Sequence, residues 1–177
     1  MYGDVVDGVI REATPVRNPG VYGASKYLAE RLFAAESHWL PCVALRLPGV
    51  LGAGAHRAWI PRLLDRIRSS EHVTIYNPQS MFNNAAHVCD LNNFYMKLFK
   101  GHWSGFHAFP IGAAGQMSIA AIVKMFISTT GSRSTVTEGA PEKSAFTVSS
   151  HYAVRNFSYS PMDIETMLRQ YVGESTH

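Results

Sequence analysis

Apolar and polar positions along the chain alternate between helical and extended patterns. A helix is predicted over about residues 22–37, where Leu28, Leu32 and Ala35 share one apolar face and Pro41 ends the segment. Residues 42–47 carry apolar side chains on both faces and predict a buried strand of a parallel sheet. Residues 48–54 form the loop at the carboxyl end of that strand, where open α/β sheets bind ligands.

The rest of the chain predicts shorter elements. Helices are expected over about residues 59–69, 90–99 with Asp90 as the cap, 118–128 with Ser118 as the cap, and 162–171. Strands are expected at 73–76, 85–88, 106–111 and near 135–137, whereas residues 1–20 and most of 131–160 predict irregular structure. Only the strand at 42–47 has the pattern of a sheet centre, so we expect an α/β fold that is incomplete.

Composition narrows the function classes. The 177 residues are 46% hydrophobic and 16% charged, as in a globular protein. The net charge is only +3, and the closest basic grouping, at residues 57–68, fits the surface of an ordinary helix, so we predict no nucleic-acid partner. No apolar run approaches the roughly 20 residues that span a bilayer, and we predict neither a membrane partner nor a signal peptide.

The remaining chemistry-bearing residue types give weaker indications. Cys42 and Cys89 lie in apolar stretches and predict buried, reduced thiols, which suits a cytoplasmic protein. The histidines lack the spacing of metal ligands, so no metal site is predicted. Residues 23–27 lack the second glycine of a serine hydrolase's nucleophile elbow.

Tyr22 and Lys26 form the pattern that indicates catalysis. Residues four apart on a helix lie on one face, so the ammonium group would favour the phenolate and lower the tyrosine pKa from about 10. Such a tyrosine can exchange a proton with a hydroxyl or carbonyl group while hydride moves to or from a nicotinamide. The same spacing arises by chance in many proteins, so two unrelated surface residues are the alternative.

Further segments accompany this pair in a fixed order. They are Tyr2-Gly3 with Glu12, Pro15 and Pro19, then Y-G-A-S-K-Y-L-A-E at 22–30, L-R-L-P-G-V-L-G-A-G at 45–54, A-A-H-V-C-D-L at 85–91, P-I-G-A-A-G at 110–115 before Ser118, and F-S-Y-S-P at 157–161. In the same order, they resemble six motifs of the extended short-chain dehydrogenase/reductases, the NAD-dependent epimerase/dehydratase family. These motifs are V-Y-G, Y-G-x-S-K-x-x-x-E, L-R-x-x-x-V-Y-G-P-G, F-V-H-V-x-D-L, N-I-G-x-G and L-G-[YW]-x-P.

The resemblance implies an α/β fold: the C-terminal portion of a Rossmann-type lobe interleaved with a small mixed α/β substrate lobe. Residues 1–55 and 85–101 would belong to the Rossmann-type lobe, and residues 56–84 and 102–177 to the substrate lobe. Tyr22 would be the catalytic acid/base, and Lys26 its partner and a contact to the nicotinamide ribose of NAD or NADP. The loop of Pro48, Gly49 and Val50 would lie against the nicotinamide.

The same resemblance gives further expectations. His87 and Asp90 match positions that brace the two lobes. A small-molecule substrate is implied, sugar-derived in much of the family. A homodimer is also implied, with Leu28, Leu32 and Phe33 on the helix that would form its interface.

Departures from the family pattern qualify these expectations. The glycine loop G-x-x-G-x-x-G and the serine of the Ser-Tyr-Lys triad would precede Met1, so we expect this chain alone to be inactive and to bind no cofactor usefully. Gly49 stands where sugar-nucleotide epimerases often carry asparagine, and residues 82–84 hold no arginine for a diphosphate. A reductase of a smaller, uncharged substrate is therefore open, and so is a non-catalytic remnant that binds a small molecule or a protein.

Overall fold

The computed structural model describes residues 1–5, 8–140 and 144–175. Its helices are α1 (Gly20–Ala35), α2 (Trp59–Arg68), α3 (Val88–Lys100), α4 (Ile119–Thr130), α5 (His151–Phe157) and α6 (Ile164–Glu174). Its strands are β1 (Val9–Ile10), β2 (Cys42–Arg46), β3 (Gly49–Leu51), β4 (Val73–Tyr76), β5 (Met81–Phe82), β6 (Ala85–His87), β7 (Phe106–Pro110), β8 (Met117–Ser118), β9 (Val136–Gly139) and β10 (Thr147–Val148).

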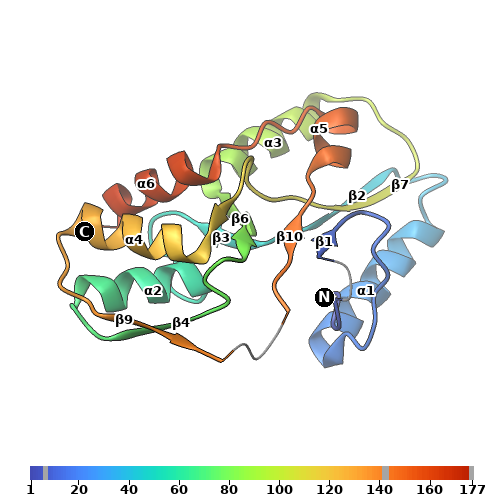
Figure 1. Cartoon of the computed structure of the whole chain (residues 1–177). Helices are drawn as coiled ribbons and strands as arrows, with labels where there is room; N and C mark the ends of the chain where they lie inside the picture. The colour runs from blue at the N-terminus through green and yellow to red at the C-terminus, as the bar shows by residue number, and fades with distance from the viewer. Residues whose placement is uncertain (6–7, 141–143, 176–177) are drawn as a thin grey trace.

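Most strand pairs are parallel and join segments far apart in the chain (Figure 1). β2 pairs with β7, β3 with β6, β4 with β9 and β1 with β10, whereas β5 pairs with β8 in antiparallel register. Parallel pairing needs a crossover, and helices such as α2 and α3 lie within these connections. The expectation of one parallel strand was therefore too narrow, because the short strands had no sequence signal for their partners.

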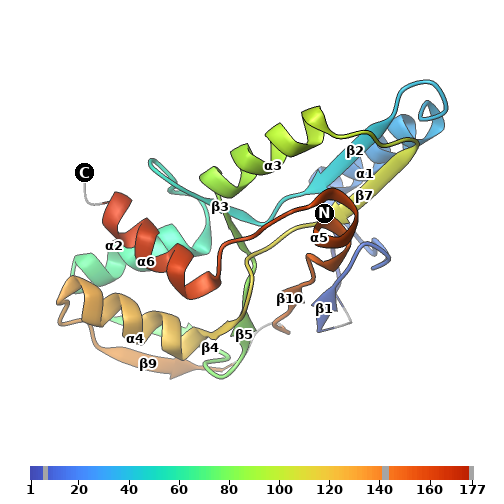
Figure 2. The same ribbon diagram turned by 90° about the horizontal axis from the view of Figure 1, so that it is seen from above.

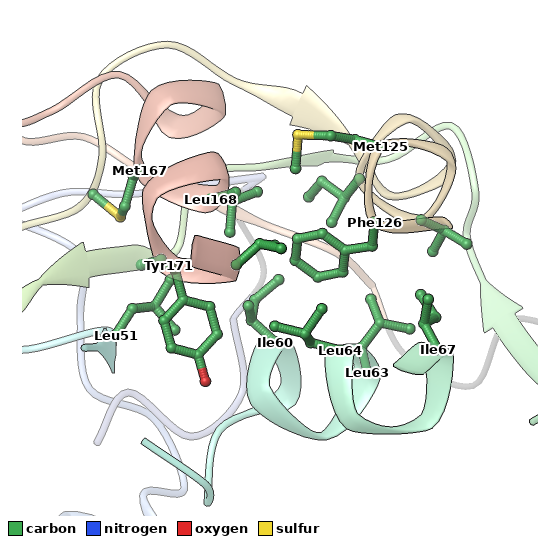
Figure 3. Close-up of a cluster of buried hydrophobic side chains, with 14 of the residues drawn as sticks. Leu51, Ile60, Leu63, Leu64, Ile67, Met125, Phe126, Met167, Leu168 and Tyr171 are labelled. Carbon is green, nitrogen blue, oxygen red and sulfur yellow. The ribbon is translucent and has the colours of Figure 1, made fainter. Parts of the chain in front are cut away.

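Three helices enclose the larger core (Figure 3). Ile60, Leu63, Leu64 and Ile67 lie at helical spacing on α2 and turn one apolar stripe toward α4 and α6. Phe126 of α4 is fully buried in this cluster, beside the buried side chains of α6. We call the region of α2, α4 and α6 the helical core.

A second cluster is aromatic and lies between α3, β7 and α5. The rings of Phe109 and Phe157 are 5.0 Å apart between centroids, and those of Phe94 and Tyr159 are 4.8 Å apart. Helix α5 and strand β10 lie within residues 131–160, for which irregular structure had been predicted, so that prediction is wrong for them.

The capping predictions have mixed outcomes. Ser118 caps α4 as expected, because its hydroxyl accepts a hydrogen bond from the Ala121 N–H. Asp90 does not cap α3: His87 does, and Asp90 lies in the first turn. Its carboxylate instead accepts from the Met162 N–H at 2.8 Å, a partner distant in sequence.

Helix α1 differs most from expectation. Leu28 and Leu32, the expected apolar face, are 60% and 62% exposed. Within α1 the buried residues are Gly23 and Glu30. Gly23 permits a close approach, because an added Cβ would stand 2.9 Å from the Met1 carbonyl oxygen. The large apolar side chains of α1 are therefore exposed. The helix itself lies at the opposite end of the molecule from α2, α4 and α6 (Figure 2).

Two burial predictions also fail. Strand β2 is only partly buried along its length, since α1 and β7 leave one side open. Cys89 is exposed and Cys42 is partly buried, and both are free thiols. None of the helices in the described ranges combines the length and apolar composition of a membrane span.

Candidate active site

Tyr22 and Lys26 lie one turn apart on the first half of α1. The Lys26 ammonium group is 5.3 Å from the centroid of the Tyr22 ring. Tyr22 is 72% exposed, and within the described residues neither its hydroxyl nor the Lys26 ammonium group has a hydrogen-bond partner. Both polar groups are therefore available to a ligand, as a proton-transfer pair requires.

An open cavity of about 760 Å³ lies beside this pair. Its lining includes Tyr22 and Lys26 from α1, the partly buried residues of β2, and Pro48 and Gly49 after that strand. The structure thus brings four of the five sequence-predicted site residues to one cavity. Val50 is the exception, because it packs against the aromatic cluster instead.

A buried ion pair fixes α1 against β2. Arg46 of β2 donates from Nε to Glu30 Oε1 at 3.0 Å and from Nη2 to Glu30 Oε2 at 2.8 Å, a bidentate arrangement. Each side chain is only 10% exposed. Burial of the guanidinium lowers its pKa, but hydrogen bonds to Glu30 and Tyr2 outweigh this and leave the pKa of Arg46 raised.

The same arginine also holds the N-terminal segment. Arg46 Nη1 donates to the Tyr2 hydroxyl at 3.0 Å and to the Glu12 carbonyl oxygen at 3.3 Å. Burial raises the pKa of Tyr2, so that hydroxyl stays protonated and donates to the Arg11 carbonyl oxygen at 3.4 Å. Glu30 lies one turn beyond Lys26, so the ion pair sets which face of α1 meets the cavity.

Sequence reasoning missed this cluster, although its signal was present. Glu30 ends the segment that begins at Tyr22, and Arg46 follows Leu45 in the next motif. Arg46 is the one charged residue in the otherwise apolar run at 42–47, which indicates a charge that a partner must hold.

Residues 82–84 hold an asparagine pair with two different environments. Asn83 is buried and saturated: its Nδ2 donates to the carbonyl oxygens of Ala113 and Val148, and its Oδ1 accepts from the Val148 N–H. Asn83 therefore pins β10 beside β5. Asn84 lines the open cavity and also a smaller neighbouring one, which Gly49 lines too.

His87 and Asp90 make structural contacts. His87 is fully buried, and its Nδ1 accepts from the Cys89 N–H, so Nε2 carries the proton and donates to Glu174 at 2.9 Å. Together with the Asp90 bond to Met162, this contact ties the start of α3 to α6 and the segment before it. Within the described residues, no three His, Cys, Asp or Glu side chains gather as metal ligands.

Comparison with known proteins gives one family. The model of the family described as "NAD dependent epimerase/dehydratase family" matches residues 1–109. No curated protein matches the chain.

Solved structures extend the match over nearly the whole chain. UDP-glucuronic acid 4-epimerase from Bacillus cereus, in complex with NAD, is 19% identical with a TM-score of 0.78, over 98% of this chain and 56% of that one. MoeE5 in complex with UDP-glucuronic acid and NAD is 25% identical with a TM-score of 0.75, over 98% and 60%. dTDP-glucose 4,6-dehydratase from Bacillus anthracis, in complex with NAD, is 18% identical with a TM-score of 0.75, over 97% and 57%.

These likenesses show the fold. The chain has the mixed α/β arrangement of a Rossmann-type epimerase/dehydratase structure, and it spans 56–60% of the length of those three chains. The expected fold class, a partial Rossmann-type lobe with a mixed α/β lobe, is thereby confirmed.

Proposed function

Because the chain belongs to the NAD dependent epimerase/dehydratase family, we propose that it forms part of an NAD(P)-dependent oxidoreductase acting at a C–OH/C=O centre. One observation carries the proposal: Tyr22 and Lys26 present unpartnered polar groups to the same cavity. The cavity volume of about 760 Å³ lies within the range of small-molecule sites.

Tyr22 acts as the acid/base in this proposal. Its hydroxyl gives a proton to the substrate oxygen when a carbonyl is reduced and takes one back when an alcohol is oxidised. Lys26 places a positive charge beside the ring, which favours the anionic form of the tyrosine during the transfer. Arg46 and Glu30 act as positioning residues, since their side chains bond each other and hold α1 against β2.

The donor set near Tyr22 fits the nicotinamide end of a dinucleotide. Lys26 would hydrogen-bond the ribose hydroxyls, and Pro48 and Gly49 would lie beside the ring, whereas the Val50 side chain packs against the aromatic cluster. When bound, the nicotinamide accepts or supplies the hydride. The 177 residues contain no G-x-x-G-x-x-G, so we expect this chain alone to bind NAD and NADP weakly. NAD is the favoured cofactor, because the matched structures hold it.

The substrate is proposed to be a small molecule. The matched epimerase and dehydratase structures carry nucleotide-sugar names, which supports a sugar-derived substrate. Epimerisation, dehydration and simple reduction all use the proton transfer assigned to Tyr22. The division into lobes at residues 55, 84 and 101 is part of the same proposal.

Two measurements test the function. Calorimetry of the 177-residue chain should show no micromolar binding of NAD(H) or NADP(H); micromolar binding would refute the predicted dependence on a glycine loop. In the polypeptide that supplies that loop, Tyr22→Phe should lower kcat by about 10²–10⁴-fold. Tyr27→Phe is the matched control on the same helix and should keep normal turnover. Normal turnover in Tyr22→Phe would sink the assignment.

A non-catalytic binding module is the second candidate. It is favoured by the exposed apolar side chains of α1, of which Phe33 also lines the open cavity. The DNA upstream of the first codon separates the two functions. An in-frame sequence that encodes a glycine-rich loop supports the enzyme, whereas stop codons in every frame support the module.

A further inference from the structure

A small cavity of about 260 Å³ lies behind Gly49. Its walls come from the end of β3, the start of α2 and the β5–β6 segment, and they are Gly49, Leu51, Ala58, Trp59, Ile60, Phe82, Asn84 and Ala85. Two of these residues carry a polar side-chain group: Asn84 has its carboxamide, and Trp59 has its indole N–H. The other walls are apolar. The rings of Trp59 and Phe82 are 5.0 Å apart, which gives the cavity an aromatic side.

Gly49 lies where this cavity adjoins the open one, a place that we call its entrance. It lines both cavities, and a Cβ added there would stand 3.4 Å from Ala58 Cβ and 3.6 Å from the Asn84 carbonyl oxygen. A side chain at position 49 would therefore project between two walls of the smaller cavity. The backbone of Gly49 has no positive φ, so its conformation does not require glycine. The missing side chain leaves space between Ala58 and the Asn84 backbone.

Asn84 provides the polar group at this entrance. It also lines both cavities, it is half-buried, and its carboxamide has no hydrogen-bond partner among the residues that the structure describes. Its neighbour Asn83 has a saturated amide, so the two side chains have separate roles. No fully buried side-chain N or O among the described residues lacks a partner, so the Asn84 amide is open to solvent and free to bond a ligand oxygen or N–H.

We propose that the smaller cavity receives an uncharged, apolar end of the substrate, and that Asn84 hydrogen-bonds the oxygen next to it. This inference rests on the proposed oxidoreductase function, but it replaces the sugar-derived substrate that the matched structures suggest with an aryl or alkyl alcohol or ketone. The volume of 260 Å³ lies just below the 300–1,000 Å³ of sites for whole ligands, so the cavity suits one end of a molecule whose reacting carbon lies at Tyr22.

Charge argues against a diphosphate here. No lysine or arginine is among the described residues that line the smaller cavity. In the open cavity the Arg46 guanidinium is held by Glu30, and the Lys26 ammonium group is assigned to the nicotinamide ribose. A diphosphate would thus meet an apolar, aromatic surface without the charged donors that repay its desolvation. The substrate class differs in this respect from the nucleotide sugars bound in MoeE5.

The test measures binding to the 177-residue chain without cofactor. Acetophenone, an uncharged aryl ketone, should shift the indole N–H signal of Trp59 in ¹H–¹⁵N spectra and leave those of Trp39 and Trp103 in place. Gly49→Val should weaken this binding at least tenfold, because its branched side chain fills the entrance. Gly173→Val, at an exposed position of α6 outside these cavities, is the matched control and should leave the binding unchanged.

A second variant tests the hydrogen bond and does not depend on Gly49→Val folding normally. Asn84→Ala should weaken acetophenone binding about two- to tenfold, as the loss of one hydrogen bond implies. The same variant should leave ethylbenzene binding within about twofold, because ethylbenzene has no oxygen. Equal losses for both probes would show that Asn84 acts only through packing, and would overturn its role.

Two further outcomes would overturn the substrate class. One is the absence of a Trp59 shift with acetophenone. The other is a Trp59 shift with UDP-glucose that displaces acetophenone. Neither outcome bears on the proposed proton transfer. The turnover of Tyr22→Phe tests that transfer, whereas the Trp59 signal tests binding in the cavity.

Discussion

The helical core and helix α1 use similar side chains in opposite ways. In the helical core, Leu64, Ile67 and Phe126 are fully buried among neighbours from three helices. On α1, Phe33 is 53% exposed and Leu32 is 62% exposed. The apolar content of a helix therefore does not tell whether it contributes to the core. The helical core buries its apolar side chains, whereas the candidate chemistry lies on a helix that leaves them exposed.

The difference has a physical cause in what each helix packs against. The apolar stripe of α2 repeats at helical spacing, and its buried residues share one cluster with side chains of α4 and α6. Helix α1 meets β2 and β7 on one side, where Gly23 and Glu30 are buried, and its anchor is the Arg46–Glu30 pair. A packed stripe holds the first region together, and a charged contact holds the second.

The largest predicted effect compares two phenylalanines. Phe126→Ala should lower the free energy of unfolding by about 3–5 kcal/mol, because it removes a fully buried ring and leaves a cavity. Phe33→Ala should change it by less than about 0.5 kcal/mol, as at an ordinary surface position. Urea unfolding of both variants and the unsubstituted chain measures the contrast.

A large loss in Phe33→Ala would break the comparison. It would mean that α1 is covered in solution, and sedimentation over a range of protein concentrations would then identify a second copy as the cover. If the predicted homodimer forms through Leu28, Leu32 and Phe33, the stability lost in Phe33→Ala will depend on protein concentration.

The next effect compares two arginines. Arg46→Met should lower the free energy of unfolding by about 3 kcal/mol, because the Glu30 carboxylate then stays buried without a partner. Arg169→Met, which breaks the exposed pair with Glu165 on α6, should cost about 0.3–0.5 kcal/mol. Thermal or urea unfolding at pH 7 measures both. Similar values for the two would show that the charged contact does not anchor α1.

The sequence predicted most helices because their signals are local. The periodic stripe at residues 59–69 and Ser118 at the start of α4 each act within a few residues, and both predictions are confirmed within a residue or two. The family and the gathering of Tyr22, Lys26, Pro48 and Gly49 at one cavity also followed from short motifs in order. Their catalytic and binding roles stay predictions.

The failures concern contacts that no local pattern encodes. Asp90 has the right residue type for a cap, but His87 occupies the cap position because β6 ends there, and Asp90 bonds Met162 across 72 residues. The face of α1 looked like a core face because Leu28 and Leu32 have helical spacing, yet both side chains are exposed. In the sequence, residues 82–84 drew notice only because they lack an arginine. The unpartnered amide of Asn84 can be recognised only in the three-dimensional structure.

The smallest predicted effect tests whether the helical core also depends on charge at its edge. Glu174 ends α6, and hydrogen bonds from Gln170 and from His87 lower the pKa of its carboxyl group. A lowered pKa in the folded state stabilises the protein above the unfolded value of about 4.3, and this stability is lost as the pH falls through the folded value. The side chain is 32% exposed, so solvent screens the effect.

Glu174→Gln cannot titrate and should lose less stability than the unsubstituted chain between about pH 5 and pH 3. Urea unfolding across that range measures the difference, and parallel curves for the two proteins would mean that apolar packing alone sets the stability of the helical core.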